Sequence, residues 1–166
     1  MLYGRNDKPS TAQRCELAQQ MFPKLRLSLL DGCSHMVHWD QQAEFERQAI
    51  AFAIGLARIL VERRAHAAAL SALDGAAGAA ANNPEFHVLR GGVLQRLARH
   101  REAVEAYQSS VRIQAASPQA WIGMGISFDA LAQRPEAVDA FRRSLAAGPL
   151  SAELKSFAEQ RVRALQ

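Results

Sequence analysis

The side chains of this sequence that could bind a metal ion or act as nucleophiles include five histidines and two cysteines. His35 and His38 are three residues apart, a spacing that places both on one face of a helix and suits a metal ion. No third ligand stands at a recognisable spacing from this pair, so no metal site is predicted. Cys15 and Cys33 form neither a C-x-x-C motif nor a disulfide framework, and we expect two reduced thiols in the cytoplasm.

His35, His38 and both cysteines lie within positions 1–53, where the sequence predicts a strand, a helix, a second strand and a second helix. The first strand precedes Asp7 and the second precedes His35. The second helix starts at Gln41 and is predicted to continue towards Leu60. Two short parallel strands without neighbours leave unpaired edges and an uncovered face. We therefore expect this segment to dock on the rest of the chain, to pair with a second copy, or to remain loose.

This order of elements resembles the C-terminal end of an α/β-hydrolase, in the subgroup that cleaves carbon–carbon bonds of ring-fission products. The residues that carry the resemblance are Cys33-Ser34-His35-Met36, Asp40 and Glu44-Phe45. Ser34 and Met36 depart from the Gly and Trp of the family pattern. The resemblance implies that Asp7 is the acid of a catalytic triad and that His35 is its general base.

The nucleophile of such a triad is absent, because the sequence contains no G-x-S-x-G motif and no oxyanion-hole sequence. Without an activated hydroxyl or thiol, a His-Asp dyad has nothing to deprotonate. No catalytic residue is therefore expected in the isolated chain, and no esterase or carbon–carbon hydrolase activity. The alternative is a hydrolase fragment that becomes active when another polypeptide supplies the nucleophile.

The sequence from Pro84 to Pro149 repeats itself with a period of 34 residues. Residues that match across the two copies are Pro84 and Pro118, Gly91 and Gly125, Leu97 and Leu131, Ala103 and Ala137, and Tyr107 and Phe141. The small residues are predicted to let two helices cross closely, with each glycine facing the alanine of the following helix. Asn83 and Ser117 each precede a proline, a pattern typical of an N-cap followed by the first helical position.

The second copy resembles the tetratricopeptide repeat (TPR) family. The family pattern of Trp, Leu-Gly, Tyr, Ala, Phe and Pro falls on Trp121, Met124-Gly125, Phe128, Ala137, Phe141 and Pro149. The first copy departs from it at His87, Arg90 and Ala115. The resemblance implies a mainly α fold, an α-solenoid of antiparallel helix pairs, preceded by the small β-α-β-α remnant of α/β-hydrolase type.

Three segments are predicted along the chain. They are an incomplete hydrolase-like segment over 1–53, TPR-like repeats over 54–150 divided as 54–83, 84–117 and 118–150, and a capping helix over 151–166. The copy at 54–83 is degenerate, with Ala57 in place of the glycine and Ala69 at the small crossing position. Its second helix runs into the Ala- and Gly-rich residues 75–81, which predict a frayed end or a long turn.

TPR arrays bind extended peptides or helices along the first helix of each pair, so the resemblance implies a partner groove there. The groove residues are Glu85, Val88, Gly92, Gln95 and Arg96 in one copy, and Gln119, Ile122, Ile126, Asp129 and Ala130 in the next. The Lys and Asn clamp of chaperone-type TPRs is missing, and the apolar members suit an amphipathic segment. The alternative is that the two isoleucines pack against the capping helix or a second copy of the chain.

Residues 56–166 also resemble the C-terminal repeats of the MshN family, which serves biogenesis of mannose-sensitive haemagglutinin pili, a type IV pilus system. The resemblance rests on residues 121–126, 129–131 and 160–165. It implies a role in pilus or secretion assembly. In that family the repeats follow a membrane anchor, and none is predicted in this sequence.

Composition limits the remaining possibilities, since 49% hydrophobic and 22% charged residues are typical of a folded, water-soluble chain. The net charge of +4 comes from scattered arginines without interleaved aromatics, so no nucleic-acid binding is predicted; the competing hypothesis requires affinity that falls steeply with salt. No signal peptide or transmembrane segment is predicted. We expect a cytoplasmic protein without a cofactor that binds a protein or peptide, with peripheral association with an assembly complex and homo-oligomerisation as open alternatives.

Overall fold

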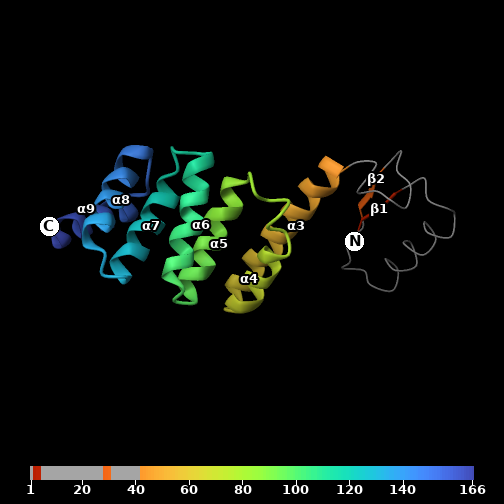
Figure 1. Ribbon diagram of the computed structural model, residues 1–166, viewed down its shortest axis with the longest axis horizontal. Coiled ribbons are helices and arrows are strands. Elements are labelled where there is room, and N and C mark those ends of the chain that lie inside the picture. Colours follow the sequence, from red (N-terminus) through yellow and green to blue (C-terminus); the bar gives the residue numbers. More distant parts are fainter. Residues whose placement is uncertain (1, 5–27, 31–41) are drawn as a thin grey trace. The chain divides into compact units, whose positions relative to one another are not determined.

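The computed structural model describes residues 2–4, 28–30 and 42–166 (Figure 1). The chain divides into two compact units, Met1–Ala51 and Phe52–Gln166. In the first unit, β1 (Leu2–Gly4) pairs in parallel with β2 (Ser28–Leu30). This two-stranded pair alone does not make a hydrolase fold, and Asp7, His35 and His38 lie outside the described residues, as do both cysteines.

The second unit, called here the helical unit, is built from helices joined by turns. The helices of the described chain are α3 (Gln42–Glu62), α4 (His66–Asp74), α5 (Pro84–Arg96), α6 (His100–Ile113), α7 (Pro118–Ala130), α8 (Arg134–Ala147) and α9 (Ala152–Leu165). From α4 onwards each helix packs against the next, so the helices follow one another in chain order (Figure 1). Helix α3 confirms the predicted continuation towards Leu60, and residues 75–82 form the predicted long turn.

Two helix starts are fixed by the residues that the sequence predicts as N-caps. The side chain of Asn83 accepts a hydrogen bond from the Phe86 N–H at 2.9 Å, and the Ser117 hydroxyl accepts one from the Ala120 N–H at 3.4 Å. A proline follows each cap at the start of the helix. Each cap satisfies a backbone donor that has no partner within its helix, so these predictions are confirmed.

The turn inside each helix pair has the same backbone conformation three times. Arg64, Ala98 and Ala132 have positive φ angles of 59°, 56° and 58° and are spaced 34 residues apart. In each turn the N–H of this residue donates to the carbonyl three positions earlier, and the next N–H donates to the carbonyl five positions before it. This pair of bonds is the Schellman ending of a helix. Helix α3 therefore ends in the same way as α5 and α7.

The nearest neighbours of the glycines at the helix crossings are aromatic rings. A Cβ atom added at Gly91 would lie 2.7 Å from the Tyr107 ring, and one added at Gly125 would lie 2.7 Å from the Phe141 ring. Each ring comes from the residue one turn beyond the predicted alanine. Helical side chains lean towards the N-terminus, so the ring covers the turn that holds the alanine. The glycines do permit close packing, but against aromatic rings.

Candidate functional site

Helix α7 packs against both α6 and α8 and presents two opposite sides. Successive side chains of a helix are rotated by about 100°, so Met124 and Ile126 point in directions about 200° apart. The side that bears Ile126 continues along α5 and contains the predicted partner-binding residues. The side that bears Met124 opens between α6 and α8. These two surfaces are the candidate sites.

The first surface, the α5–α7 face, consists of the ten residues predicted to form a partner groove. Those that are exposed are Glu85, Arg96, Gln119, Ile126 and Ala130. Those that are partly buried are Val88, Gly92, Gln95 and Asp129. The remaining member, Ile122, is buried. The structure thus brings these residues onto one side of α5 and α7 but does not leave all of them accessible to a partner.

Helix α9 covers one end of the α5–α7 face. Ile122 is only 6% exposed and belongs to a buried cluster that includes Ala158 of α9. The carboxylate of Asp129 accepts a hydrogen bond from the guanidinium of Arg161, also on α9. The expected apolar strip is therefore shorter by one residue, because Ile122 packs towards the last helix, as the alternative interpretation holds.

Gln95 holds three helices together rather than facing solvent. Its side-chain amide donates to the carbonyl of Gly123 and to the hydroxyl of Ser127, both at 2.8 Å. Its side-chain oxygen accepts from the hydroxyl of Tyr107 at 2.8 Å. Burial raises the pKa of Tyr107, so the hydroxyl stays protonated and remains a donor at neutral pH. This network joins α5, α6 and α7 and was not predicted from the sequence.

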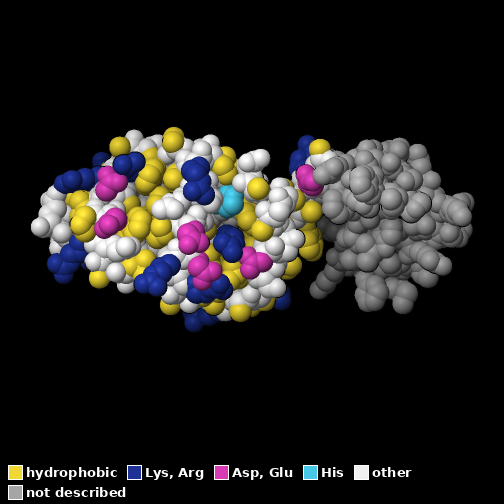
Figure 2. Space-filling view, viewed as in Figure 1, with side chains coloured by type: hydrophobic (Ala, Val, Ile, Leu, Met, Phe, Trp, Pro, Cys, Tyr) yellow, Lys and Arg dark blue, Asp and Glu magenta, His cyan; other side chains and the backbone are white. Residues whose placement is uncertain are grey.

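The charged members of the α5–α7 face also have partners within the helical unit. Glu85 pairs with Arg58 of α3, and both side chains are more than half exposed. The guanidinium of Arg96 donates to the carbonyl of Gly92 at 2.9 Å. Exposed pairs of this kind exchange readily with water and with other partners. Figure 2 shows basic and acidic side chains interspersed over the face of the helical unit that is in view.

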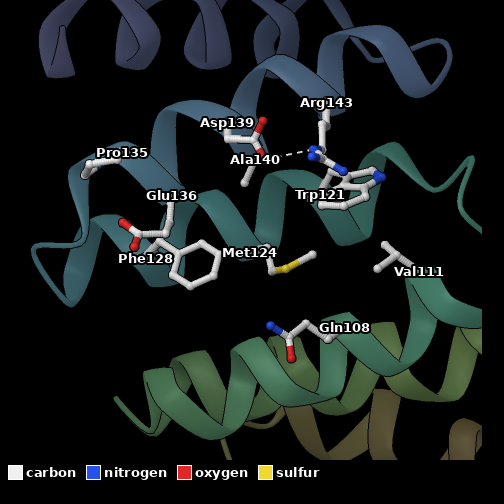
Figure 3. A pocket seen from close by; sticks show the side chains of 10 residues that line it. All are labelled: Gln108, Val111, Trp121, Met124, Phe128, Pro135, Glu136, Asp139, Ala140 and Arg143. Carbon is white, nitrogen blue, oxygen red and sulfur yellow. Dashed lines mark hydrogen bonds and ion pairs between the residues drawn. The ribbon is translucent and has the colours of Figure 1, made fainter.

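The second surface, the α6–α8 hollow, has a volume of about 480 Å³ and opens on the opposite side of α7 (Figure 3). Its floor is formed by the partly buried Trp121 and Phe128 of α7, with Met124, which is only 3% exposed, beneath them. Gln108 lines one wall and Glu136 the other. A smaller hollow of about 330 Å³ shares Gln108 and Phe128 with it and extends it along α6 and α7.

One end of the α6–α8 hollow is closed by a cation over an aromatic ring. The guanidinium of Arg143 lies 5.0 Å from the centre of the Trp121 ring, and its Nε donates to Asp139 at 2.8 Å (Figure 3). Phe128 matches the TPR pattern; it is partly buried, packs against the buried cluster that contains Ile122, and also lines the hollow. Residues of the TPR pattern were assigned to packing, and so the hollow was missed.

Among the residues that the structure describes, no three His, Cys, Asp or Glu side chains come together in a way that could hold a metal ion. Within the same residues, none of the helices combines the length and the apolar character needed to span a membrane.

No protein-family model matches the chain, and no curated protein matches its sequence. Solved structures do match the fold. The type III secretion chaperone SycD of Yersinia enterocolitica, in complex with a peptide of the translocator YopD, has a TM-score of 0.65 and 12% identity over 71% of this chain and 92% of that chain. The TPR domain of Arabidopsis OM64 has a TM-score of 0.66 and 18% identity over 72% of this chain and 98% of that chain.

A third match is the first TPR of Spaghetti (RPAP3) bound to the HSP90 peptide SRMEEVD. It has a TM-score of 0.65 and 19% identity over 71% of this chain and 94% of that chain. At these identities the matches establish the fold and nothing beyond it. The helical unit therefore has a TPR-type fold.

Proposed function

We propose that the helical unit is a non-enzymatic scaffold that binds a peptide or an amphipathic segment of a partner protein on the α5–α7 face. The observation that carries the proposal is Ile126, which is 37% exposed on the first helix of its pair. The structures of SycD with a YopD peptide and of Spaghetti with an HSP90 peptide support a peptide as the partner, since they share this fold.

The chemistry of the face favours an amphipathic segment over a C-terminal carboxylate. The α5–α7 face lacks the Lys and Asn clamp with which chaperone-type TPRs hold a C-terminal carboxylate. Ile126 and Val88 offer apolar contacts, while Gln119 and Arg96 lie on the same two helices and can bind backbone or acidic groups. A partner that binds at this face would also compete with Arg58 for the carboxylate of Glu85.

The wider setting that we propose is pilus or secretion assembly in the cytoplasm, at the periphery of an assembly complex. It rests on the sequence resemblance to the MshN repeats, and the fold likeness to a type III secretion chaperone is compatible with it. Self-association of the chain is a second way in which the α5–α7 face could be covered.

The test uses peptides selected from a random displayed library against the full chain. Ile126→Asp should weaken the selected peptides at least about tenfold, because it places a charge in an apolar contact. Ile113→Asp is the matched control, since Ile113 is similarly exposed at 41% but lies at the end of α6, away from the α5–α7 face. Equal loss of affinity in both variants, or no loss with Ile126→Asp, would refute the proposed site.

A further inference from the structure

The place that corresponds to the α6–α8 hollow one repeat earlier is occupied by charged side chains. There the Nε of Arg90 donates to Asp74 at 3.0 Å. Arg99 binds Glu102 through two hydrogen bonds of 2.5 and 2.6 Å. The hydrogen bonds from Arg99, with a further contribution from the charge of Arg90, lower the pKa of Glu102. The two arginines and two carboxylates compensate one another.

A shift of 34 residues shows which of these charges the α6–α8 hollow has lost. The corresponding residues are Asp74 and Gln108, Arg90 and Met124, Arg99 and Gln133, and Glu102 and Glu136. Both arginines and one carboxylate are replaced by uncharged residues, and a single carboxylate is retained. Among the described residues, Glu136 has no ion pair. The change leaves apolar residues of α7 beside a carboxylate that has no ion pair with the residues that the structure describes.

We propose that the α6–α8 hollow is a second docking site, for a segment of a partner protein that carries a large aliphatic side chain next to a lysine or arginine. The aliphatic side chain would rest on Phe128 and on the small part of Met124 that is exposed. The basic group would take the place that Arg90 and Arg99 occupy beside Glu102 in the preceding repeat. A space of about 480 Å³ lies in the range of sites that bury a small ligand, so it accepts a few side chains and not a folded domain.

The local charges select against an anionic ligand such as nucleic acid. The charge of Arg143 is balanced by Asp139, which lines the same hollow. Glu136 lines the same hollow and would repel a phosphate or a carboxylate. The site lies on the opposite side of α7 from the α5–α7 face, so it does not depend on the function proposed there.

The test measures binding of a synthetic amphipathic peptide of Leu, Ala and Lys to the full chain, with a peptide in which Glu replaces Lys as its counterpart. Trp121 lines the hollow and is one of two tryptophans in the chain, so its fluorescence reports binding in a Trp39→Phe background. The Lys peptide should change the emission of Trp121, and the Glu peptide should bind at least about tenfold more weakly.

Two variants restore the charges of the preceding repeat. Gln133→Arg, at an exposed position, recreates the pair of Arg99 and Glu102 and should weaken the Lys peptide about three- to fivefold. The double variant Met124→Arg and Gln108→Asp recreates the pair of Arg90 and Asp74 inside the hollow and should weaken it at least about tenfold. Ile126→Asp on the opposite side of α7 should change the affinity less than about twofold.

Several results would overturn the proposal. They are the absence of a Trp121 response at about 1 mM Lys peptide, equal binding of the Glu peptide, and unchanged affinity in the Gln133→Arg variant. Loss of binding in Ile126→Asp alone would also overturn it, and would assign the peptide to the α5–α7 face. The single surface variant keeps the test decisive if the double variant fails to fold.

Discussion

Replacing Gly123 by alanine tests how α6 and α7 are packed. An added Cβ would lie 2.7 Å from both Cε1 and the hydroxyl oxygen of Tyr107, closer than real Cβ contacts allow. The ring has little room to move away, because Gly91 lies against it as well: a Cβ added at Gly91 would lie 2.7 Å from the Tyr107 ring. Its hydroxyl is also held by the hydrogen bond to Gln95. Tyr107 is thus confined between two glycines of different helices.

The magnitude follows from three opposing contributions. Overpacking costs about 1 to 3 kcal/mol, and displacement of the Tyr107 hydroxyl from Gln95 costs about 0.5 to 1.5 kcal/mol more. Alanine is a better helix former than glycine by about 1 kcal/mol, which offsets part of the loss. We therefore expect Gly123→Ala to lower the free energy of unfolding by about 2 kcal/mol.

The assay is urea unfolding of the full chain followed by the helical circular dichroism signal. Gly55→Ala is the matched control, because nothing lies within 4 Å of its added Cβ in α3. This control should raise the free energy of unfolding by about 1 kcal/mol. Tyr107→Leu should reduce the penalty of Gly123→Ala by at least about 1 kcal/mol, since it removes the confined ring. The reasoning is refuted if Gly123→Ala is as stable as the parent, or if its penalty is unchanged when it is combined with Tyr107→Leu.

Three further predictions concern the turns, the last helix and the alkaline limit. Ala132→Gly should stabilise the chain by about 1 kcal/mol, because a positive φ of 58° strains a residue with a side chain. The control in the same urea assay is Ala130→Gly, at an exposed helical position, which should destabilise the chain by about the same amount. Asp129→Asn removes the ion pair with Arg161, so amide exchange in α9 should quicken about threefold while exchange in α5 is unchanged, and equal protection of α9 in both proteins would contradict this. Burial raises the pKa of Tyr107 above the ordinary value of 10.0, so its contribution to stability is complete below about pH 10 and is lost as the pH rises further. The free energy of unfolding, measured from about pH 9 to about pH 11, should fall in the parent and fall less in Tyr107→Phe. If it falls equally with pH in both proteins, groups other than Tyr107 cause the loss.

The helices could be predicted from the sequence because their signals act locally. Asn83 caps a donor three residues away, and the proline after it fixes the backbone at the next position. The 34-residue period then places the second copy by comparison with the first. Such signals need no knowledge of distant neighbours, and they located both helix starts.

The neighbours of each side chain could not be predicted in the same way. The sequence pairs Gly91 with Ala103 on the following helix. The ring of Tyr107, one turn further along that helix, leans back towards its N-terminus and contacts Gly91. Ile122 has the helical spacing of an open groove position, but α9 buries it. Helical periodicity tells which side of a helix is apolar, and not whether a later helix covers that side.

The α6–α8 hollow could be recognised only by combining both kinds of information. Trp121, Met124 and Phe128 match the TPR pattern, in which such residues pack helices together; Met124 is indeed buried, whereas Trp121 and Phe128 are partly buried and line the hollow. The replacement of Arg90 by Met124 between the copies was a visible signal of a difference at this place. Its consequence needed the structure, because the ion pair with Asp74 joins residues from two helices.

The turn that recurs at Arg64, Ala98 and Ala132 has a consequence for how the protein can change in length. Each turn is held by backbone hydrogen bonds, and both arginine and alanine occupy its positive-φ position, so it does not depend on one particular side chain. A recombination event that duplicated or deleted one period would join two copies of the same backbone geometry. The array could therefore gain or lose a helix pair in one genetic step, while each remaining joint kept its shape.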